Sequence, residues 1–273
     1  MDSKKILFIT DIHQNLDAVK KINFNDFDQI LCGGDILLTE KPDINTAIKI
    51  IELMPDSTII VPGNCDNNSQ LIRFMKEKLV FLHKKVINIL NNLPLLGIGY
   101  CRSVISDFKN YRDYFLQDTS RVLEFYQNSQ FKDILHYLGI SVHNNSVKVK
   151  DEEEYLKNAR DYDRGKFFHF TEDEIKNLFS GIDNLKNGII LTHSPAYLFL
   201  DKLESLPHSG SEEILKGVMK TRPSLVLSGH FHEISGRVVK DNIIYFNPGA
   251  LKDYKAGIIT VTNEVYQVES ISV

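Results

Sequence analysis

Seven residues whose side chains can bind a metal ion follow short apolar runs of the sequence. Carboxylate, imidazole and carboxamide groups together form a mixed oxygen and nitrogen ligand set, which suits Mn, Fe, Ni, Zn or Mg better than a metal that prefers thiolates. Because one cation rarely needs seven ligands, the set predicts a site for two divalent metal ions that share one carboxylate. The candidate ligands are Asp11, His13, Asp35, Asn64, His193, His230 and His232.

The spacing within two of the motifs supports a shared site. Asp11 and His13 are two positions apart, and so are His230 and His232. In an extended segment, residues i and i+2 leave the chain on the same face. Both members of each pair can therefore reach one site.

The apolar runs that precede the candidate ligands are typical of buried strands; they span 6–10, 30–34, 58–63, 188–192 and 224–229. Helical patterns lie between several of them, as in Ile44, Ala47, Ile48 and Ile51 at spacings of three and four. Alternating strands and helices predict an α/β fold with largely parallel pairing in its first half. In such folds ligands bind beyond the carboxyl ends of the strands, which is where all seven residues are expected.

The chain is expected to form one domain, residues 1–273, that carries a mostly helical insertion at 102–187. The insertion is rich in charged residues and aromatics, and a capping box of Thr171 and Glu174 opens one of its helices. It could be a lid over the site or a surface for homodimerisation or another protein partner. After it, strands are expected at 224–228, 237–239, 243–246 and 257–261. An Asp241-Asn242 turn predicts a hairpin and hence a mixed sheet.

Composition excludes several classes of protein. The 273 residues are 42% hydrophobic and 25% charged, which excludes disorder, and a net charge of −4 provides no global positive field for nucleic acid or anionic lipid. The three cysteines form no Cys-x-x-Cys pair, which favours a reducing compartment. The sequence shows neither a signal-peptide core nor an apolar run of about 20 residues that could span a membrane. A soluble cytoplasmic protein is expected.

The order of the motifs resembles the calcineurin-like metallophosphoesterase superfamily, over residues 5–100 and 188–273. The C-terminal motifs are similar to those of its small, stand-alone archaeal and bacterial branch. The resemblance implies a β-sandwich of mixed sheets flanked by helices, with a two-metal centre that hydrolyses a phosphate ester. It rests on Asp11-Ile12-His13, Gly34-Asp35, Gly63-Asn64-Cys65-Asp66, Thr192-His193-Ser194-Pro195, His208-Ser209-Gly210-Ser211, Gly229-His230-Phe231-His232 and Asn247-Pro248-Gly249.

The resemblance also implies a role for each residue. Asp11, His13, Asp35 and His232 would hold one metal, and Asp35, Asn64, His193 and His230 the other. Asp35 would bridge the two ions. A hydroxide shared by the metals would then attack the phosphorus atom in line, so that no nucleophilic side chain is needed. Asn64 would also contact the substrate.

Cys65 departs from the family pattern, in which His usually follows the metal-binding Asn and assists the leaving group. A thiol is a weak hydrogen-bond donor. Related small enzymes without that His tend toward phosphodiesters, so phosphodiesterase activity is favoured. The alternatives are a phosphomonoesterase or protein phosphatase, whose fuller signature is absent, and a binding scaffold without catalysis.

Three further residues have two readings each. His208 either contacts the substrate phosphate or its leaving group, as a catalytic residue, or simply precedes a helix. Asn15 either lies at the substrate edge of the site, which the resemblance favours, or caps the helix from Leu16. Asp66 either orients a metal ligand or caps the helix that begins near Asn68, and the cap is the favoured reading.

Overall fold

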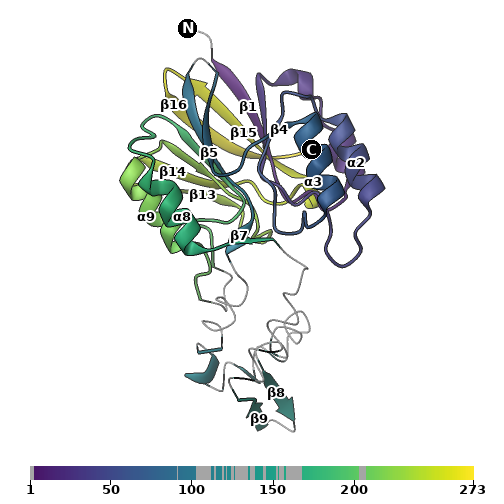
Figure 1. Cartoon of the computed structure of the whole chain (residues 1–273), viewed down its shortest axis with the longest axis vertical. Coiled ribbons are helices and arrows are strands. Elements are labelled where there is room, and N and C mark those ends of the chain that lie inside the picture. Colours follow the sequence, from purple (N-terminus) through teal and green to yellow (C-terminus); the bar gives the residue numbers. More distant parts are fainter. Residues whose placement is uncertain are drawn as a thin grey trace.

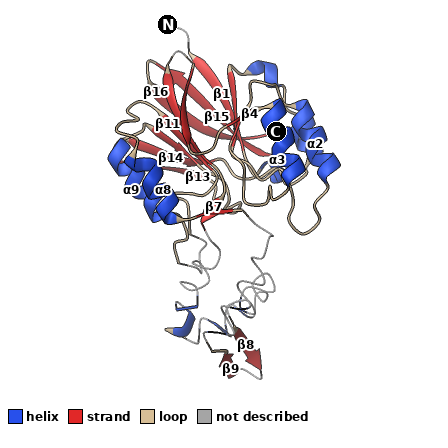
Figure 2. Ribbon diagram, viewed as in Figure 1, coloured by secondary structure: helices blue, strands red, loops and turns tan. Residues whose placement is uncertain are grey.

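The computed structural model describes residues 3–90, 92–102, 168–202 and 207–273, together with parts of 112–157. Its main body is two six-stranded sheets packed face to face, with helices on both outer faces (Figures 1 and 2). The predicted fold, a sandwich of mixed sheets flanked by helices, is confirmed. About half of the predicted helical insertion at 102–187 lies outside the described residues.

The first sheet has the strand order β16-β15-β1-β2-β3-β4. Strands β1 to β4 are parallel, whereas β15 pairs antiparallel with both β1 and β16. Its strands are β1 (Lys4–Ile9), β2 (Gln29–Cys32), β3 (Ile59–Ile60), β4 (Val80–Phe81), β15 (Lys255–Thr262) and β16 (Val265–Ser272). Parallel pairing places the ends of β1, β2 and β3 at one edge, and the loops that follow them carry four of the candidate ligands.

The second sheet has the order β13-β14-β12-β11-β6-β5. Its four central strands are parallel and its two edge strands antiparallel. Its strands are β5 (Lys85–Ile89), β6 (Leu93–Ile98), β11 (Ile189–Thr192), β12 (Leu225–Leu227), β13 (Gly236–Lys240) and β14 (Ile243–Asn247). The predicted hairpin is confirmed, because Asp241 and Asn242 both adopt positive φ between β13 and β14.

The apolar runs are continuous because the central strands are buried on both faces. In β1, Ile6 and Phe8 pack into the core between the two sheets, whereas Leu7 and Ile9 pack outward against the helices. Helices α1 (Leu16–Lys20), α2 (Ile44–Leu53) and α3 (Ser69–Lys78) contribute to this outer core of the first sheet. Helices α8 (Glu172–Ser180) and α9 (Glu212–Thr221) cover the second sheet. The helices thus hold both sheets, and the loops at their ends, in fixed positions.

Each of these helices begins at a side chain that accepts a hydrogen bond from the backbone N–H three residues further on. Thr171 and Glu174 form the predicted capping box. The cap of α3 is Asn68, so the reading of Asp66 as its cap is wrong. The five capping residues are Asn15, Asp43, Asn68, Thr171 and Ser211.

Some of the described parts of residues 102–187 pack near the two sheets, and others lie away from them. Strands β7 (Cys101–Arg102) and β10 (His169–Phe170) pair in parallel, and α8 packs with α9 against the second sheet. Beyond β7, β8 (Ile140–His143) and β9 (Ser146–Val149) form an antiparallel hairpin away from the two sheets (Figure 1). Among the described residues, no helix is both long and apolar enough to cross a bilayer.

Candidate metal centre

The loops that follow β1 and β2 are joined by backbone hydrogen bonds. Asp11 N donates to Gly34 O over 2.9 Å, and His13 N donates to Asp35 O over the same distance. Gly34 has a φ of +89°, and a side chain there would collide with the backbone around Gly63. Glycine is therefore required where the loops after β2 and β3 meet. The three loops form one unit at the edge of the first sheet.

Four of the candidate ligands adopt the left-handed backbone conformation that non-glycine residues rarely occupy. Their φ angles are 53° for Asp11, 43° for His13, 55° for Asp35 and 70° for His230. Such conformations persist where the surrounding structure imposes them, and they concentrate at functional sites. The backbone is thus held in unfavourable conformations at the positions of these four candidate ligands.

The buried side chain of Asp66 holds these loops together through hydrogen bonds. It is fully buried, and its carboxylate accepts hydrogen bonds from the backbone N–H groups of Gly63, Asp35, Ile36 and Leu37 over 2.8–3.1 Å. Burial and the nearby Asp35 raise the pKa of Asp66 to about 7, although hydrogen bonds from Gly63 and Leu37 oppose the shift. The favoured sequence reading missed this role, because the contacts come from a loop about thirty residues away in the sequence.

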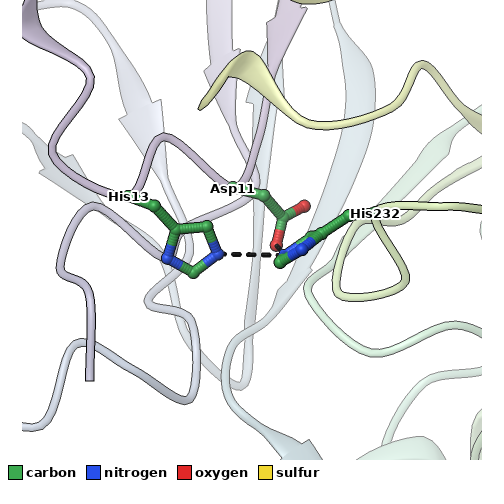
Figure 3. A group of neighbouring side chains, drawn as sticks. All are labelled: Asp11, His13 and His232. Atoms are coloured by element: carbon green, nitrogen blue, oxygen red, sulfur yellow. Dashed lines mark hydrogen bonds and ion pairs between the residues drawn. The ribbon is translucent and has the colours of Figure 1, made fainter. Parts of the chain in front are cut away.

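Asp11, His13 and His232 form the first group of candidate ligands (Figure 3). His232 Nε2 lies 3.2 Å from Asp11 Oδ1 and 2.9 Å from His13 Nε2. The potential ligand atoms of the three side chains all lie within 4.8 Å of one another. Two of these residues come from the first sheet and one from the second, so the group spans the sandwich.

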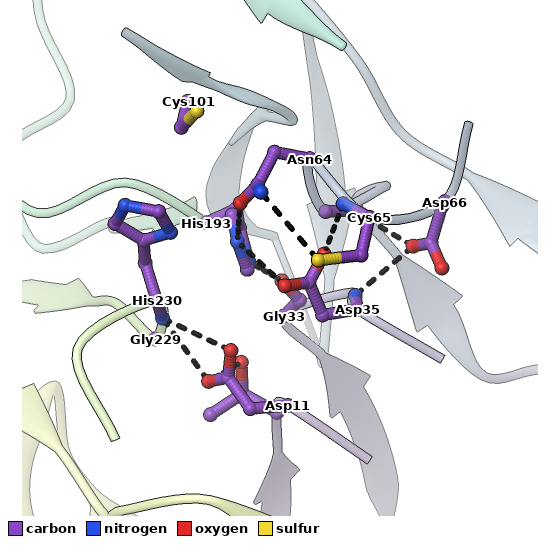
Figure 4. Close-up of polar contacts among 12 residues, drawn as sticks. Asp11, Gly33, Asp35, Asn64, Cys65, Asp66, Cys101, His193, Gly229 and His230 are labelled. Atoms are coloured by element: carbon purple, nitrogen blue, oxygen red, sulfur yellow. Dashed lines mark hydrogen bonds and ion pairs between the residues drawn. The ribbon is translucent and has the colours of Figure 1, made fainter. Parts of the chain in front are cut away.

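A second group contains Asp11, Asp35 and His193, with Asn64 next to it (Figure 4). His193 Nε2 is 2.8 Å from Asn64 Oδ1 and 3.4 Å from Asp35 Oδ2. All four side chains belong to residues that are at most 5% exposed. The groups therefore meet in a buried centre at the carboxyl ends of the strands, as the α/β pattern predicts.

Asp35 lies between the two sets of histidines. The same oxygen, Oδ2, is 3.8 Å from His13 Nε2 and 3.4 Å from His193 Nε2. The other oxygen, Oδ1, accepts a hydrogen bond from Cys65 N over 2.7 Å. The carboxylate is thus held with one oxygen facing both imidazoles.

His230 approaches the centre differently. Its backbone N–H donates to both carboxylate oxygens of Asp11, over 3.1 and 3.2 Å. Its ring packs edge-on to that of His193, with 5.2 Å between the ring centroids, and it is not a member of the groups described above. The structure therefore places His230 beside the second group, whereas the six other candidates contact one another directly.

Two of the imidazoles are oriented by backbone carbonyls. His13 Nδ1 lies 2.8 Å from Leu37 O, and His193 Nδ1 lies 2.8 Å from Gly33 O. A proton on Nδ1 that is donated to a carbonyl leaves the Nε2 lone pair free to bind a metal. Both Nε2 atoms point into the cluster of carboxylates, and this donor chemistry fits divalent cations.

The electrostatics of the cluster favour ionised carboxylates. Burial raises the pKa of Asp35, but His193 and His13 outweigh it and hold this pKa well below its ordinary value; Asp11 is likewise lowered, chiefly by His232 against burial. Burial lowers the pKa of His193, yet Asp35 and Asp11 bring it to about 9. The surrounding carboxylates therefore favour a protonated His193, and bound cations would compete with that proton.

Cys65 lies at the edge of the centre, and its Sγ forms a third group with ligand atoms of His13 and Asp35. Burial, followed by the charge of Asp35, raises the pKa of this thiol far above its ordinary value. Asn64 Nδ2 donates to Sγ over 3.5 Å. The Cys65 side chain is therefore a protonated thiol at neutral pH.

His208 and Asn15 have other partners. His208 Nδ1 is 2.6 Å from Asp201 Oδ1, and its ring packs edge-on to Tyr197. Asn15 caps α1 by accepting from Ala18 N, and its amide donates to Lys252 O. The capping alternative for Asn15 is thus observed, and both ends of its carboxamide are engaged.

Lys252 was not foreseen from the sequence. Its Nζ lies 2.7 Å from His232 Nδ1, and its backbone N–H donates to Asp11 O. It belongs to the short 3-10 helix Leu251–Asp253, which β14 and β15 flank. No motif or spacing singles out this lysine, because it reaches the centre only through the packing of that turn.

The solved structures that resemble this chain share its fold. One crystal structure superposes with a TM-score of 0.65 at 16% identity, covering 99% of this chain and 100% of its own. The protein TT1561 of Thermus thermophilus superposes with a TM-score of 0.53 at 14% identity, covering 98% of this chain and 99% of its own. A comparison with curated proteins found no match.

The sequence itself matches a family over most of its length. The match extends over residues 4–233 and is described as calcineurin-like phosphoesterase. It contains all seven candidate ligands and the loops that hold them. The chain therefore belongs to the calcineurin-like phosphoesterases, metal-dependent hydrolases of phosphate esters.

Proposed function

We propose that this protein is a phosphodiesterase that works with two divalent cations. Asp11, His13, Asp35 and His232 would hold one ion, and Asp35, Asn64, His193 and His230 the other. The observation that carries this assignment is the position of Asp35 Oδ2, within 3.8 Å of an imidazole nitrogen from each set. One carboxylate oxygen facing two sets of donors is suited to bridging two cations.

The residues of the chain would bind and orient the reacting groups. When bound, the cations would supply Lewis acidity and an activated water for in-line attack. The carbonyls of Leu37 and Gly33 keep the imidazoles of His13 and His193 in the required tautomer. The backbone N–H of Cys65 and the carboxylate of Asp66 fix the position of Asp35. These hydrogen bonds thus hold the carboxylates and imidazoles in fixed positions around the proposed ion sites.

The preference for diesters rests on Cys65. Its thiol holds its proton strongly and is a weak hydrogen-bond donor, so it assists a departing alkoxide poorly. His208 pairs with the buried Asp201, an arrangement that would orient its Nε2 as a proton donor toward a substrate. We keep His208 as a candidate substrate-contacting residue, while the helix-capping contact of Asn15 makes a substrate role for it less favoured.

The test compares bis(4-nitrophenyl) phosphate with 4-nitrophenyl phosphate, using the protein loaded with Mn²⁺. We expect hydrolysis that chelation abolishes, with the diester favoured. Cys65→His should raise kcat/KM for β-glycerophosphate, a monoester whose alkoxide leaving group needs a proton, relative to kcat/KM for the bis ester by about tenfold, within the range that one general acid contributes. Cys65→Ser is the control, because it changes the side chain without adding an imidazole. An unchanged ratio in Cys65→His would contradict the role of Cys65, and no turnover of either ester would favour a scaffold without catalysis.

A further inference from the structure

A cavity of about 260 Å³ lies against Cys65. Leu37, Thr39 and Ile44 line it from the segment between β2 and the start of α2. Cys65 and Asn68 line it from the loop between β3 and α3. The cavity is thus formed by two of the loops that build the candidate metal centre.

Cys65 lies between the cavity and the centre. Its sulfur is within 4.8 Å of potential ligand atoms of His13 and Asp35, and the same residue lines the cavity. Leu37 is also shared, because its carbonyl orients His13 while the residue lines the cavity. If a substrate phosphate bound at the cations, only Cys65 would therefore separate its ester substituent from the cavity.

The lining favours an uncharged occupant. Leu37 and Ile44 supply apolar surface, and no Lys, Arg, Asp or Glu is among the lining residues. The Thr39 hydroxyl can donate or accept a hydrogen bond. The Asn68 carboxamide oxygen accepts from Leu71 N, so this side chain can offer an occupant only its amide hydrogens. A charged group here would lose hydration without gaining an opposite charge from a lining side chain. The volume is below the usual ligand range of about 300–1,000 Å³, which suits a single ring rather than a larger molecule.

We propose that this cavity binds one ester substituent of the substrate, an uncharged group with a single ring of the size of a phenyl or pyrimidine. The inference rests on the proposed function and specifies its substrate class: a phosphodiester with a compact, uncharged ring next to the scissile phosphate. It predicts discrimination against a diester whose substituent at this position is charged.

A second cavity provides a matched control. It has about 450 Å³ and is lined by Ile72, Arg73, Lys76, Tyr100 and Phe168, among others. Ile72 on α3 and Ile44 on α2 are both half-buried and pack against the same outer core. We therefore expect the same substitution at the two positions to perturb folding to a similar degree while filling different cavities.

The experiment measures hydrolysis of bis(4-nitrophenyl) phosphate and methyl 4-nitrophenyl phosphate by Mn²⁺-loaded protein. We expect Ile44→Trp to lower kcat/KM for the bis ester about tenfold or more, as occlusion of an apolar pocket does, and Ile72→Trp to change it less than about twofold. A loss shared by the methyl ester would place the leaving ring in the cavity, and a loss confined to the bis ester would place the retained ring there. Thr39→Leu, at another residue that lines the same cavity, provides a second variant if Ile44→Trp does not fold.

The outcomes separate this inference from the proposed function. If wild-type protein hydrolyses diesters but folded Ile44→Trp, or folded Thr39→Leu in its place, matches Ile72→Trp on both substrates, the cavity does not hold the substituent and the proposed function stands. If wild-type protein hydrolyses no diester, the proposed function itself fails. Thermal unfolding of each variant confirms that the compared proteins are folded.

Discussion

At the scale of single residues, the sequence identifies the side chains that gather at the candidate centre but not how they are held. The types and strand-end positions of Asp11, Asp35 and His193 are sufficient to predict that they lie together. The left-handed conformation of Asp11 and the buried hydrogen bonds of Asp66 are not predictable, because both depend on contacts between separate loops. An aspartate two residues before Asn68 suits a helix start equally well, so only the folded structure distinguishes the roles.

We expect Asp66→Ala to destabilise the protein by about 3 kcal/mol or more, because four buried backbone N–H groups lose their acceptor and each unsatisfied group costs roughly 1–3 kcal/mol. Urea unfolding measures the loss. Asp66→Asn should cost less, since its remaining carbonyl oxygen still accepts hydrogen bonds. Equal and small effects of both substitutions would show that Asp66 does not hold the loops.

At the scale of elements, most strands and helices of the two sheets follow from local patterns. The runs before the ligands become β1, β2, β3, β11 and β12, and the Asp241-Asn242 turn joins β13 to β14. Strand β16 is not predicted because it lies at a sheet edge and much of it is exposed, so it lacks a continuous apolar run. Strands β4, β5 and β6 are likewise absent from the predicted set. Helix α8 was expected in the insertion, but it packs on the second sheet through contacts with α9 that the sequence does not reveal.

His83, just before β5, makes an element-scale contact that depends on pH. Its Nδ1 accepts a hydrogen bond from Gly99 N after β6, and burial lowers its pKa to about 4. The folded protein thus binds this proton less readily than the unfolded chain, whose histidine has a pKa of about 6.5. The contribution of His83 to stability is therefore complete above pH ~6.5 and is lost as the pH falls toward 4.

The measurement compares the urea unfolding of wild-type protein and His83→Gln at pH 7 and pH 5. We expect the wild type to lose about 1 kcal/mol more than the variant over this interval, a figure reduced for the partial exposure of the ring. Glutamine can still accept the hydrogen bond from Gly99 but does not titrate. The same loss in both proteins would exclude this role of His83.

At the scale of the whole molecule, the candidate centre joins the two sheets. Asp11, His13 and Asp35 come from loops of the first sheet, and His193 and His232 from loops of the second. Cations bound there would therefore link segments that are more than 150 residues apart in the sequence, and they would stabilise the folded state relative to the unfolded chain. Dimerisation through residues 102–187 stays a prediction.

Metal loading should accordingly raise the melting temperature. A ligand at about one hundred times its dissociation constant stabilises the folded state by about 2.7 kcal/mol, which corresponds to an increase in Tm of roughly 5 °C or more for a chain of this size. Differential scanning calorimetry with Mn²⁺ and with excess EDTA measures the difference. In Asp35→Asn, which lacks the charge of the shared carboxylate, the increase should be smaller. An identical Tm with Mn²⁺ and EDTA would indicate that the sheets are not linked by cations.

The most direct test of the two-cation centre is an anomalous difference map from crystals soaked in Mn²⁺. We predict two peaks, roughly 3.5–4 Å apart, on either side of the Asp35 carboxylate. One peak should contact Asp11, His13 and His232, and the other Asn64, His193 and His230. A single peak, or manganese bound away from Asp35, would contradict the account.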